Sequence, residues 1–175
     1  MSTQCKKSAE VIVSDTQSEK DRTFSAQKLD PNYVAGFVDG EGCFCIGASK
    51  HTTMKRKVDL RPLFEIELRI DDREILERIQ ATIGCGSLYD LHYKRYDWAP
   101  HAKYKVGSVR DLCQFVIPFF DKHKLQGKKK DVYSLFRQAC FMIKEKKHLT
   151  DEGFNAVLHI RDQMRAFSKK HYRNR

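Results

Sequence analysis

The carboxylates of Asp39 and Glu41 are the groups in this sequence best placed to do chemistry. They lie in the string Asp39-Gly40-Glu41-Gly42, directly after an apolar run. If that run is a helix, both acids fall at its C-terminal end, where the helix dipole disfavours a carboxylate by roughly 0.3–1 kcal/mol. A positive partner is therefore expected, and hard cations such as Mg²⁺ prefer oxygen ligands. The predicted chemistry is metal-assisted hydrolysis.

The spacing of apolar residues predicts the helix that would carry these acids. Pro31, a residue favoured in a first helical turn, precedes the run. The residues of the run recur at helical intervals and are Tyr33, Val34, Phe37 and Val38. The helix is expected to be short and to end at Gly40 or Gly42.

Two glycines four residues apart, Gly36 and Gly40, weaken this helix by about 1 kcal/mol each relative to alanine. Such a loss is understandable if a second backbone approaches the glycine face closely. We therefore expect the helix to pack against the same helix of a second copy of the chain. The expected contact residues are Tyr33, Gly36, Phe37 and Gly40. Two sets of carboxylates would then converge, and divalent cations would relieve their repulsion.

The rest of the chain divides into strand and helix patterns. Strands are predicted at residues 43–49, 63–70, 86–93 and 103–106, and the second of them alternates cleanly between apolar and charged positions. Helices are predicted at 72–83, started by Asp71 or Asp72 and stopped by Gly84, and in three apolar stripes beyond residue 110. The predicted class is α+β, in the order αββαββα with additional C-terminal helices.

The residues from Val34 to Glu41 resemble the signature helix of the LAGLIDADG homing endonuclease family. Val34 takes the opening position, the residues to Gly40 run in step, and Glu41 fills the final acidic slot. The likeness continues over residues 31–145. It implies a four-stranded antiparallel sheet shaped as a saddle for the DNA major groove. One such helix in one short chain implies a homodimer that binds a long, near-palindromic duplex site and cuts one phosphodiester in each strand, as an enzyme encoded in a group I intron.

The resemblance also implies roles for individual residues. Glu41 would be a metal ligand in each subunit, assisted by the backbone carbonyl of Gly42. Mg²⁺ is the expected ion, with Mn²⁺ as a substitute and Ca²⁺ binding without cleavage. A lysine in a Leu-x-x-Lys context is expected in the site, and Lys128 fits it, with Lys124 and Lys130 as rivals.

One position departs from the family pattern. Leu68 stands where relatives often carry a polar residue, so the polar pocket that organises water is incomplete. Arg73 is assigned as a catalytic residue that supplies this polarity, with Arg69 as the alternative.

The net charge of +10, from 33 Lys and Arg against 23 Asp and Glu, favours a polyanionic partner. Duplex DNA is the expected one, and the lysine-rich run at 122–130 lies where phosphate would meet a helix start. The predicted phosphate contacts are Lys55, Lys57, Arg61, Arg95, Lys103, Lys105, Lys128, Lys129 and Lys130. The predicted base-reading residues are Glu65, Glu67, Arg69, Tyr89 and Tyr93.

Other features bound the interpretation. Residues 1–29 are polar and are expected to form a mobile arm before a domain at 30–175. The sequence contains no apolar window long enough to cross a membrane and no secretory signal, so no membrane partner is expected. The expected location is intracellular, in the cytoplasm or in an organelle such as a chloroplast or mitochondrion. The six cysteines contain no C-x-x-C pair, which favours reduced thiols packed in the core over a zinc site.

Two other functions fit parts of this pattern. An RNA-splicing maturase with intron RNA as partner, or a DNA-binding regulator, would use the same fold without cleavage; Glu41 argues against this alternative and Leu68 for it. An unrelated hydrolase with Asp39 and Glu41 as an acid–base pair is disfavoured, because residues two apart at a helix end point in different directions.

Overall fold

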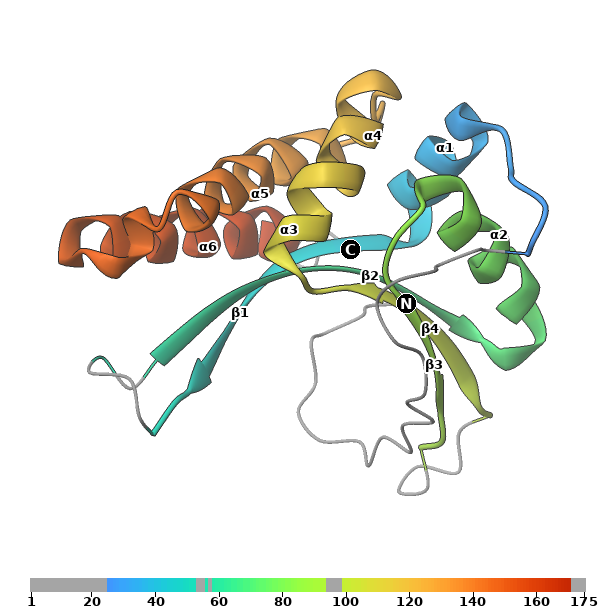
Figure 1. The fold of residues 1–175 in the computed structure, drawn as a ribbon, viewed down its shortest axis with the longest axis horizontal. Helices are drawn as coiled ribbons and strands as arrows, with labels where there is room; N and C mark the ends of the chain where they lie inside the picture. The colour runs from blue at the N-terminus through green and yellow to red at the C-terminus, as the bar shows by residue number, and fades with distance from the viewer. Residues whose placement is uncertain (1–24, 53–55, 57, 94–98, 171–175) are drawn as a thin grey trace.

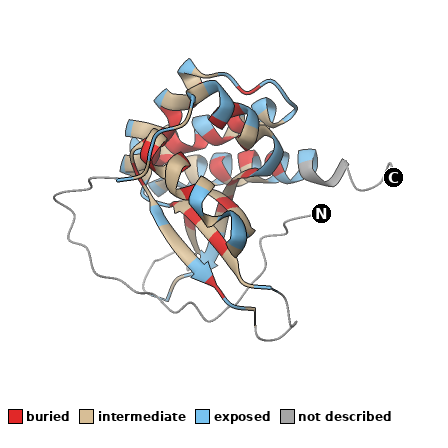
Figure 2. Ribbon diagram, turned by 90° about the vertical axis from the view of Figure 1, so that its right-hand side faces the viewer, coloured by how far each residue is buried: buried red, intermediate tan, exposed pale blue. Residues whose placement is uncertain are grey.

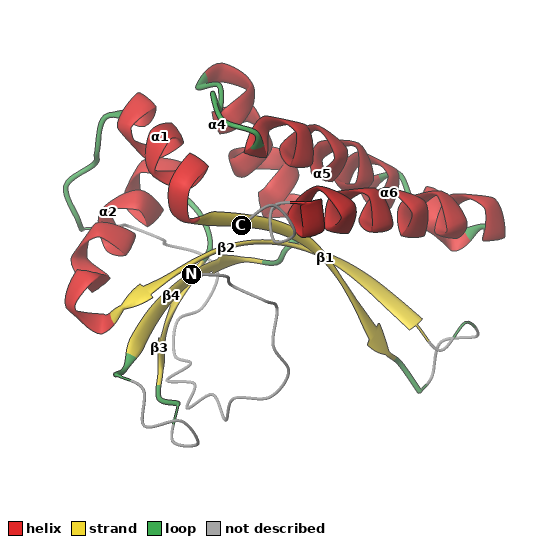
Figure 3. Ribbon diagram, turned by 180° about the vertical axis from the view of Figure 1, so that it is seen from behind, coloured by secondary structure: helices red, strands yellow, loops and turns green. Residues whose placement is uncertain are grey.

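One antiparallel sheet with helices on one of its faces makes up the structure, a computed structural model that describes residues 25–52, 56, 58–93 and 99–170, without the side chains of 168–170. The strands are β1 (Gly42–Lys50), β2 (Val58–Arg69), β3 (Ser87–Leu91) and β4 (His101–Val106), in the spatial order β1-β2-β4-β3. The helices cover one face of the sheet, and the opposite face is concave (Figures 1 and 3). The predicted αββαββα order with C-terminal helices is confirmed.

The helices follow the chain in this order. They are α1 (Pro31–Glu41), α2 (Arg73–Ile83), α3 (Val109–Asp111), α4 (Ile117–Lys122), α5 (Lys129–Lys144) and α6 (Asp151–Lys170). Two short 3₁₀ segments, η1 (Ile70–Asp72) and η3 (Lys147–Leu149), precede α2 and α6, and a π-helical turn, η2 (Leu112–Val116), joins α3 to α4. In the described part of the chain, no helix combines the length and apolar character needed to cross a membrane.

The boundaries of α1 have local causes. The side chain of Asp30 accepts hydrogen bonds from the backbone N–H groups of Asn32 and Tyr33, which fixes the start of the helix. At the other end Gly42 is extended and begins β1. A Cβ atom at Gly42 would lie 2.6 Å from a methyl carbon of Val38, so only glycine fits this close turn from helix to strand. The predicted helix end is confirmed.

The core lies between the sheet and the helices, where the buried residues gather (Figure 2). Successive strand residues point to opposite faces, and the core-facing ones include Phe44 and Phe64, whose rings stack with centroids 4.9 Å apart. Phe120 of α4 and Phe136 of α5 pack on Phe44 at 5.5 and 5.2 Å. These contacts fix α4 and α5 against the sheet, and α1 is anchored beside them by its buried Val34 and Val38.

Several strand boundaries differ from the sequence-based expectation: β3 ends at Leu91 rather than at residue 93, and β4 begins at His101 rather than at residue 103. β2 begins at Val58 rather than at residue 63, because Pro62, which argues against a central strand, lies where β2 pairs with β1 alone. Ile70 belongs to η1 and not to the strand. The predicted arm is described only from residue 25: the Leu29 N–H donates to Thr82 Oγ1, and Arg78 donates to the carbonyl of Gln27, so this part contacts α2.

Candidate functional site

The C-terminal end of α1 meets the loop that leads into α5. Oδ2 of Asp39 accepts hydrogen bonds from the backbone N–H groups of Gln126 and Gly127, at 2.7 and 3.0 Å. Oδ1 of the same carboxylate is buried without a hydrogen-bond partner. A buried oxygen of this kind normally has a partner, so Asp39 anchors the loop with one oxygen and leaves the other available to a cation.

Lys129, the first residue of α5, completes this helix end. Its Nζ donates to the carbonyl oxygens of Val38 at 2.7 Å and Gly40 at 3.3 Å. Carbonyls in the last turn of a helix carry partial negative charge and attract a cation. Burial lowers the pKa of the Lys129 ammonium, and the nearby Cys43, Asp39 and Glu41 oppose this shift without cancelling it. The ammonium therefore sits close to both acids while it bonds to backbone oxygens.

Glu41 ends α1 with an exposed side chain, directly before the buried Gly42. Carboxylate oxygens and backbone carbonyls are the ligands of hard divalent cations. The exposed Glu41 carboxylate and the unpartnered Oδ1 of Asp39 are oxygen donors at one helix end. The donor set thus fits such an ion better than a soft one.

The described residues of the chain leave one face of α1 largely uncovered. Tyr33 is 51% exposed, and a Cβ atom added at Gly36 or Gly40 would meet nothing within 4 Å. Phe37 lies beside Tyr33 on this face, with ring centroids 6.2 Å apart. The four residues occupy positions i, i+3, i+4 and i+7, whereas Val34 and Val38 point into the core. The four residues predicted to make the helix pairing contact therefore form one stripe that is mostly exposed.

The concave face of the sheet carries the charged strand residues. In the β2–β4 register Glu65 lies opposite Lys105 and Glu67 opposite Lys103, and Tyr89 of β3 lies on the other side of Lys103. Because side chains alternate along a strand, all of these residues project away from the helices. The predicted contact residues that share this face are Arg61, Glu65, Glu67, Arg69, Tyr89, Lys103 and Lys105.

Four of the side chains on this face form one network. Nζ of Lys103 lies 2.8 Å from a carboxylate oxygen of Glu67 and 3.6 Å from one of Glu65, and the Tyr93 hydroxyl donates to Glu67 at 2.5 Å. Burial acts to raise the pKa of Glu67, but the bonds from Lys103 and Tyr93 outweigh it and leave that pKa lowered. Burial and the Glu67 carboxylate raise the pKa of Tyr93 to about 12. Glu67 is thus already held by hydrogen bonds, whereas Glu65 has only the longer ion pair with Lys103.

A family model described as LAGLIDADG endonuclease matches residues 34–140. The chain belongs to this family. It is 33% identical over 133 residues to the probable intron-encoded endonuclease 2 of Neurospora crassa, an alignment that covers 76% of this chain and 27% of that protein. It is 35% identical over 130 residues to an uncharacterized 50.9 kDa protein in ND4 intron 1 of Podospora anserina, covering 73% of this chain and 27% of that one.

Solved structures of LAGLIDADG proteins show the same fold. The I-LtrWI homing endonuclease bound to target DNA superposes with a TM-score of 0.72 at 27% identity, covering 83% of this chain and 47% of that one. The homing endonuclease I-TnaI superposes with a TM-score of 0.68 at 30% identity, covering 82% of this chain and 99% of that one. The chain therefore spans about a quarter of the curated relatives named here, about half of I-LtrWI, and nearly all of I-TnaI.

In this LAGLIDADG chain the lysine that reaches the end of α1 is Lys129, whereas Lys128, predicted as the catalytic lysine, is exposed at the N-cap of α5. Lys130 is exposed too. A sequence signal for Lys129 exists, because it lies four residues before Tyr133 and seven before Phe136, in register with the buried stripe of α5. Charge alone could not separate it from its neighbours.

The two arginines considered for the polar pocket are engaged elsewhere. Arg73 begins α2 and forms ion pairs with Glu77 and with Asp90 of β3, and Arg69 pairs with Asp71 at 3.0 Å. Leu68 lies opposite Ala102 and packs on the core. Three predicted DNA contacts, Lys55, Lys57 and Arg95, lie outside the described residues.

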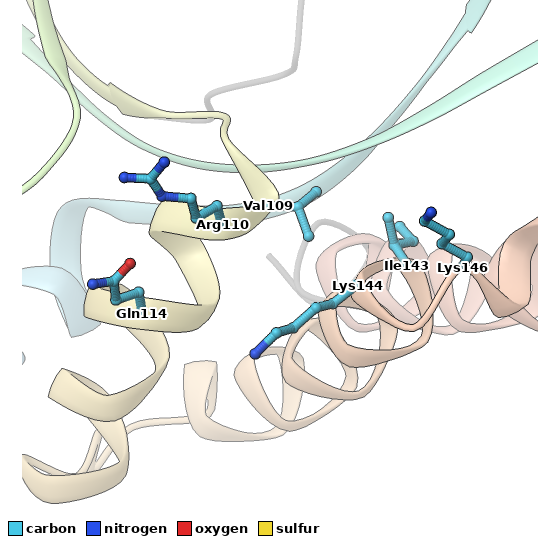
Figure 4. A pocket seen from close by; sticks show the side chains of 6 residues that line it. All are labelled: Val109, Arg110, Gln114, Ile143, Lys144 and Lys146. Carbon is cyan, nitrogen blue, oxygen red and sulfur yellow. The ribbon is translucent and has the colours of Figure 1, made fainter. Parts of the chain in front are cut away.

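A pocket on the helical side of the sheet does not add to this site. It opens between α3 and the end of α5 and is lined by Val109, Arg110, Gln114, Ile143, Lys144 and Lys146 (Figure 4). Its lining contains cationic side chains and no carboxylate. The acids that could hold a metal ion for this family's chemistry remain those at the end of α1.

Proposed function

We propose that this chain is a sequence-specific DNA endonuclease of the intron-encoded homing type, which binds a long, near-palindromic duplex site as a homodimer. The observation that carries the proposal is the position of two carboxylates and Lys129 at the end of α1, beside a concave sheet face lined with charged side chains. A concave, basic face suits a curved polyanion, and strand side chains suit the edges of bases in the major groove.

We further propose that Glu41 and the backbone carbonyl of Gly42 hold a divalent ion, with Mg²⁺ as the working ion and Mn²⁺ as a substitute. A bound ion of this kind supplies an activated water and neutralises charge on the scissile phosphate. A structure of I-SmaMI, similar to this chain at 28% identity and a TM-score of 0.70, contains an uncleaved DNA target in the presence of calcium ions. Ca²⁺ is therefore expected to support binding without cleavage.

The basic group at this centre is assigned to Lys129 in place of Lys128. Its ammonium is fixed by two backbone carbonyls and partly buried, so it has a defined position from which to hydrogen-bond a phosphate oxygen or a water. Asp39 contributes by holding the loop that carries Lys129, through its bonds to Gln126 and Gly127. Arg73, whose guanidinium is paired with Glu77 and Asp90, is left as a predicted but less favourably placed candidate.

The homodimer follows from the open stripe of α1. Two copies of the stripe Tyr33, Gly36, Phe37 and Gly40 would pack backbone to backbone, and this would bring two Glu41 carboxylates to one centre. Because the substrate is DNA, the protein is expected to act in an intracellular compartment that contains DNA, the cytoplasm or an organelle.

The test is incubation of the purified chain with plasmids that carry candidate intron-free target sites, with Mg²⁺, with Ca²⁺ and without divalent metal. Of these three conditions, we expect double-strand cleavage only with Mg²⁺. With Ca²⁺ the protein should bind the DNA without cutting it. Binding without cleavage under every metal condition would contradict the proposal and would favour the maturase or the regulator.

A further inference from the structure

A second set of metal-binding side chains lies on the concave face, next to the end of α1 but separate from Asp39 and Glu41. Cys43 and Cys45 are two residues apart on β1, so their side chains project from the same face of the sheet. Glu65 on β2 is the direct register partner of Cys43. One ligand atom from each of the three lies within 4.8 Å of the others, and all three residues are half-buried. Two strands thus bring two thiols and a carboxylate together.

The chemistry of this donor set differs from that of the helix end. Thiolates select soft or borderline ions, whereas Mg²⁺ is held by oxygen ligands. With Zn–S bonds of about 2.3 Å, ligand atoms around one tetrahedral ion lie roughly 3.8 Å apart. The observed spacing needs only a small adjustment of side-chain rotamers to reach that geometry.

We propose that Cys43, Cys45 and Glu65 form a site for a thiophilic divalent cation such as Zn²⁺, with the fourth position open to water. The ion would join β1 to β2 at the point where α1 passes into the sheet, two residues after Glu41. It would therefore fix the strand that follows the proposed nuclease carboxylate.

The neighbouring lysine does not prevent this role. Lys103 lies 3.6 Å from Glu65 but only 2.8 Å from Glu67, so Glu65 can turn to a metal while Lys103 keeps its closer partner. The proposal is independent of DNA cleavage, because it concerns binding by the free protein. A chain that never cuts DNA could still have this site.

The experiment is a titration of the reduced, full-length chain with Cd²⁺, followed through the ultraviolet charge-transfer band of cadmium–thiolate bonds, and with Zn²⁺, followed through the melting temperature. A Cys5→Ser background removes one thiol that lies outside the described residues. We expect one equivalent of Cd²⁺ to produce the band and Zn²⁺ to raise the melting temperature, since an ion that binds only the folded state stabilises it. A large excess of Mg²⁺ should displace neither ion.

Variants separate this site from other thiols and from Glu41. Cys45→Ser should abolish the band, and Glu65→Gln, which keeps the shape of the side chain, should weaken binding by about tenfold or more. Cys85→Ala is the matched thiol control, because Cys85 is buried elsewhere and its bond to Tyr104 uses the backbone carbonyl. Glu41→Gln should bind Cd²⁺ and Zn²⁺ as tightly as the wild type does. A wild-type chain without the band, a band unchanged in Cys45→Ser, or Zn²⁺ stabilisation unchanged in Glu65→Gln would each overturn the proposal.

Discussion

The end of α1 and the concave face of the sheet hold their charges in opposite ways. On the sheet, Glu67 receives hydrogen bonds from Lys103 and Tyr93, and Arg61 pairs with Asp59. At the end of α1 the ammonium of Lys129 bonds to backbone carbonyls and not to a carboxylate, and Asp39 keeps a buried oxygen without a partner. Glu67 and Asp59 on the sheet are paired with cationic side chains, whereas the two acids at the helix end form no ion pair among the described residues. Recognition and cleavage should therefore respond to different mutations.

The largest expected effect is on cleavage by Glu41→Gln. The loss of a metal ligand removes several kcal/mol of charge stabilisation in the transition state, so cleavage in Mg²⁺ should fall by about a thousandfold or more. DNA affinity in Ca²⁺ should change little, because the sheet face is intact. The melting temperature should stay or rise slightly, since a charge at the negative helix end is removed. Cleavage at the wild-type rate would remove Glu41 from the mechanism.

A smaller loss of cleavage is expected for Lys129→Met. A positioned proton-transfer or charge-stabilising group is typically worth about a hundredfold, and methionine keeps the length of the side chain that crosses to α1. Lys128→Met is the matched control, because Lys128 is the adjacent residue and its side chain is exposed. Single-turnover rates at saturating DNA should separate the two variants. A wild-type cleavage rate for Lys129→Met would mean that Lys129 takes no part in the chemistry.

Gly36→Leu tests the open face of α1, which has no part in the proposed base contacts or the proposed metal site. Overpacking a close contact costs about 1–3 kcal/mol, so dimerisation should weaken by roughly tenfold or more. The single chain has room for the new side chain, so its fold should survive. Ala156→Leu on the exposed side of α6 is the control. Sedimentation of the wild type as a monomer, with and without DNA, would contradict the dimer.

The smallest effect concerns stability and pH at the sheet. The folded-state pKa of Glu67 is lowered from its usual value of 4.5. The ionised side chain therefore stabilises the fold above pH 4.5, and this stabilisation is lost as the pH falls through the lowered pKa. Glu67→Gln should therefore cost about 1 kcal/mol or less at neutral pH, and this difference should shrink in acid. Urea unfolding of the wild type and of Glu67→Gln, each at neutral and at acidic pH, measures this difference in the free energy of unfolding. Glu145→Gln, which breaks only the exposed pair with Lys147, should show little change at either pH.

The fold was largely predictable because its signals are periodic. The stripe of α1, the alternation of Phe64 to Leu68 and the stop at Gly84, which adopts a positive φ of 88°, each follow from local spacing. The start of β2 was not predictable in the same way, since Pro62 is tolerated only because β4 ends its pairing at Phe64. That information lies in the register between strands.

The site was predictable only where it lies within one element. Asp39 and Glu41 could be placed from their position on α1, but the choice between Lys128 and Lys129 depends on how α5 rotates against the core. The sequence interpretation of the cysteines as core thiols holds for Cys85, Cys113 and Cys140, which are buried. It missed the approach of Cys43 to Glu65, because a register partner 22 positions away leaves no motif in the sequence.

The bonds that Val38, Asp39 and Gly40 make with residues 126–129 join parts of the chain 87–91 positions apart. Contacts so far apart along the chain carry a loop-closure cost, which slows their formation. During synthesis, a growing chain that has produced α1 and all four strands still lacks the lysine at the helix end. If the proposed nuclease activity holds, a prematurely terminated product that stops before residue 129 would lack both the lysine beside the acids and the α5 residues that pack on the sheet. The order of synthesis would then act as a safeguard for the DNA of the cell that makes the protein.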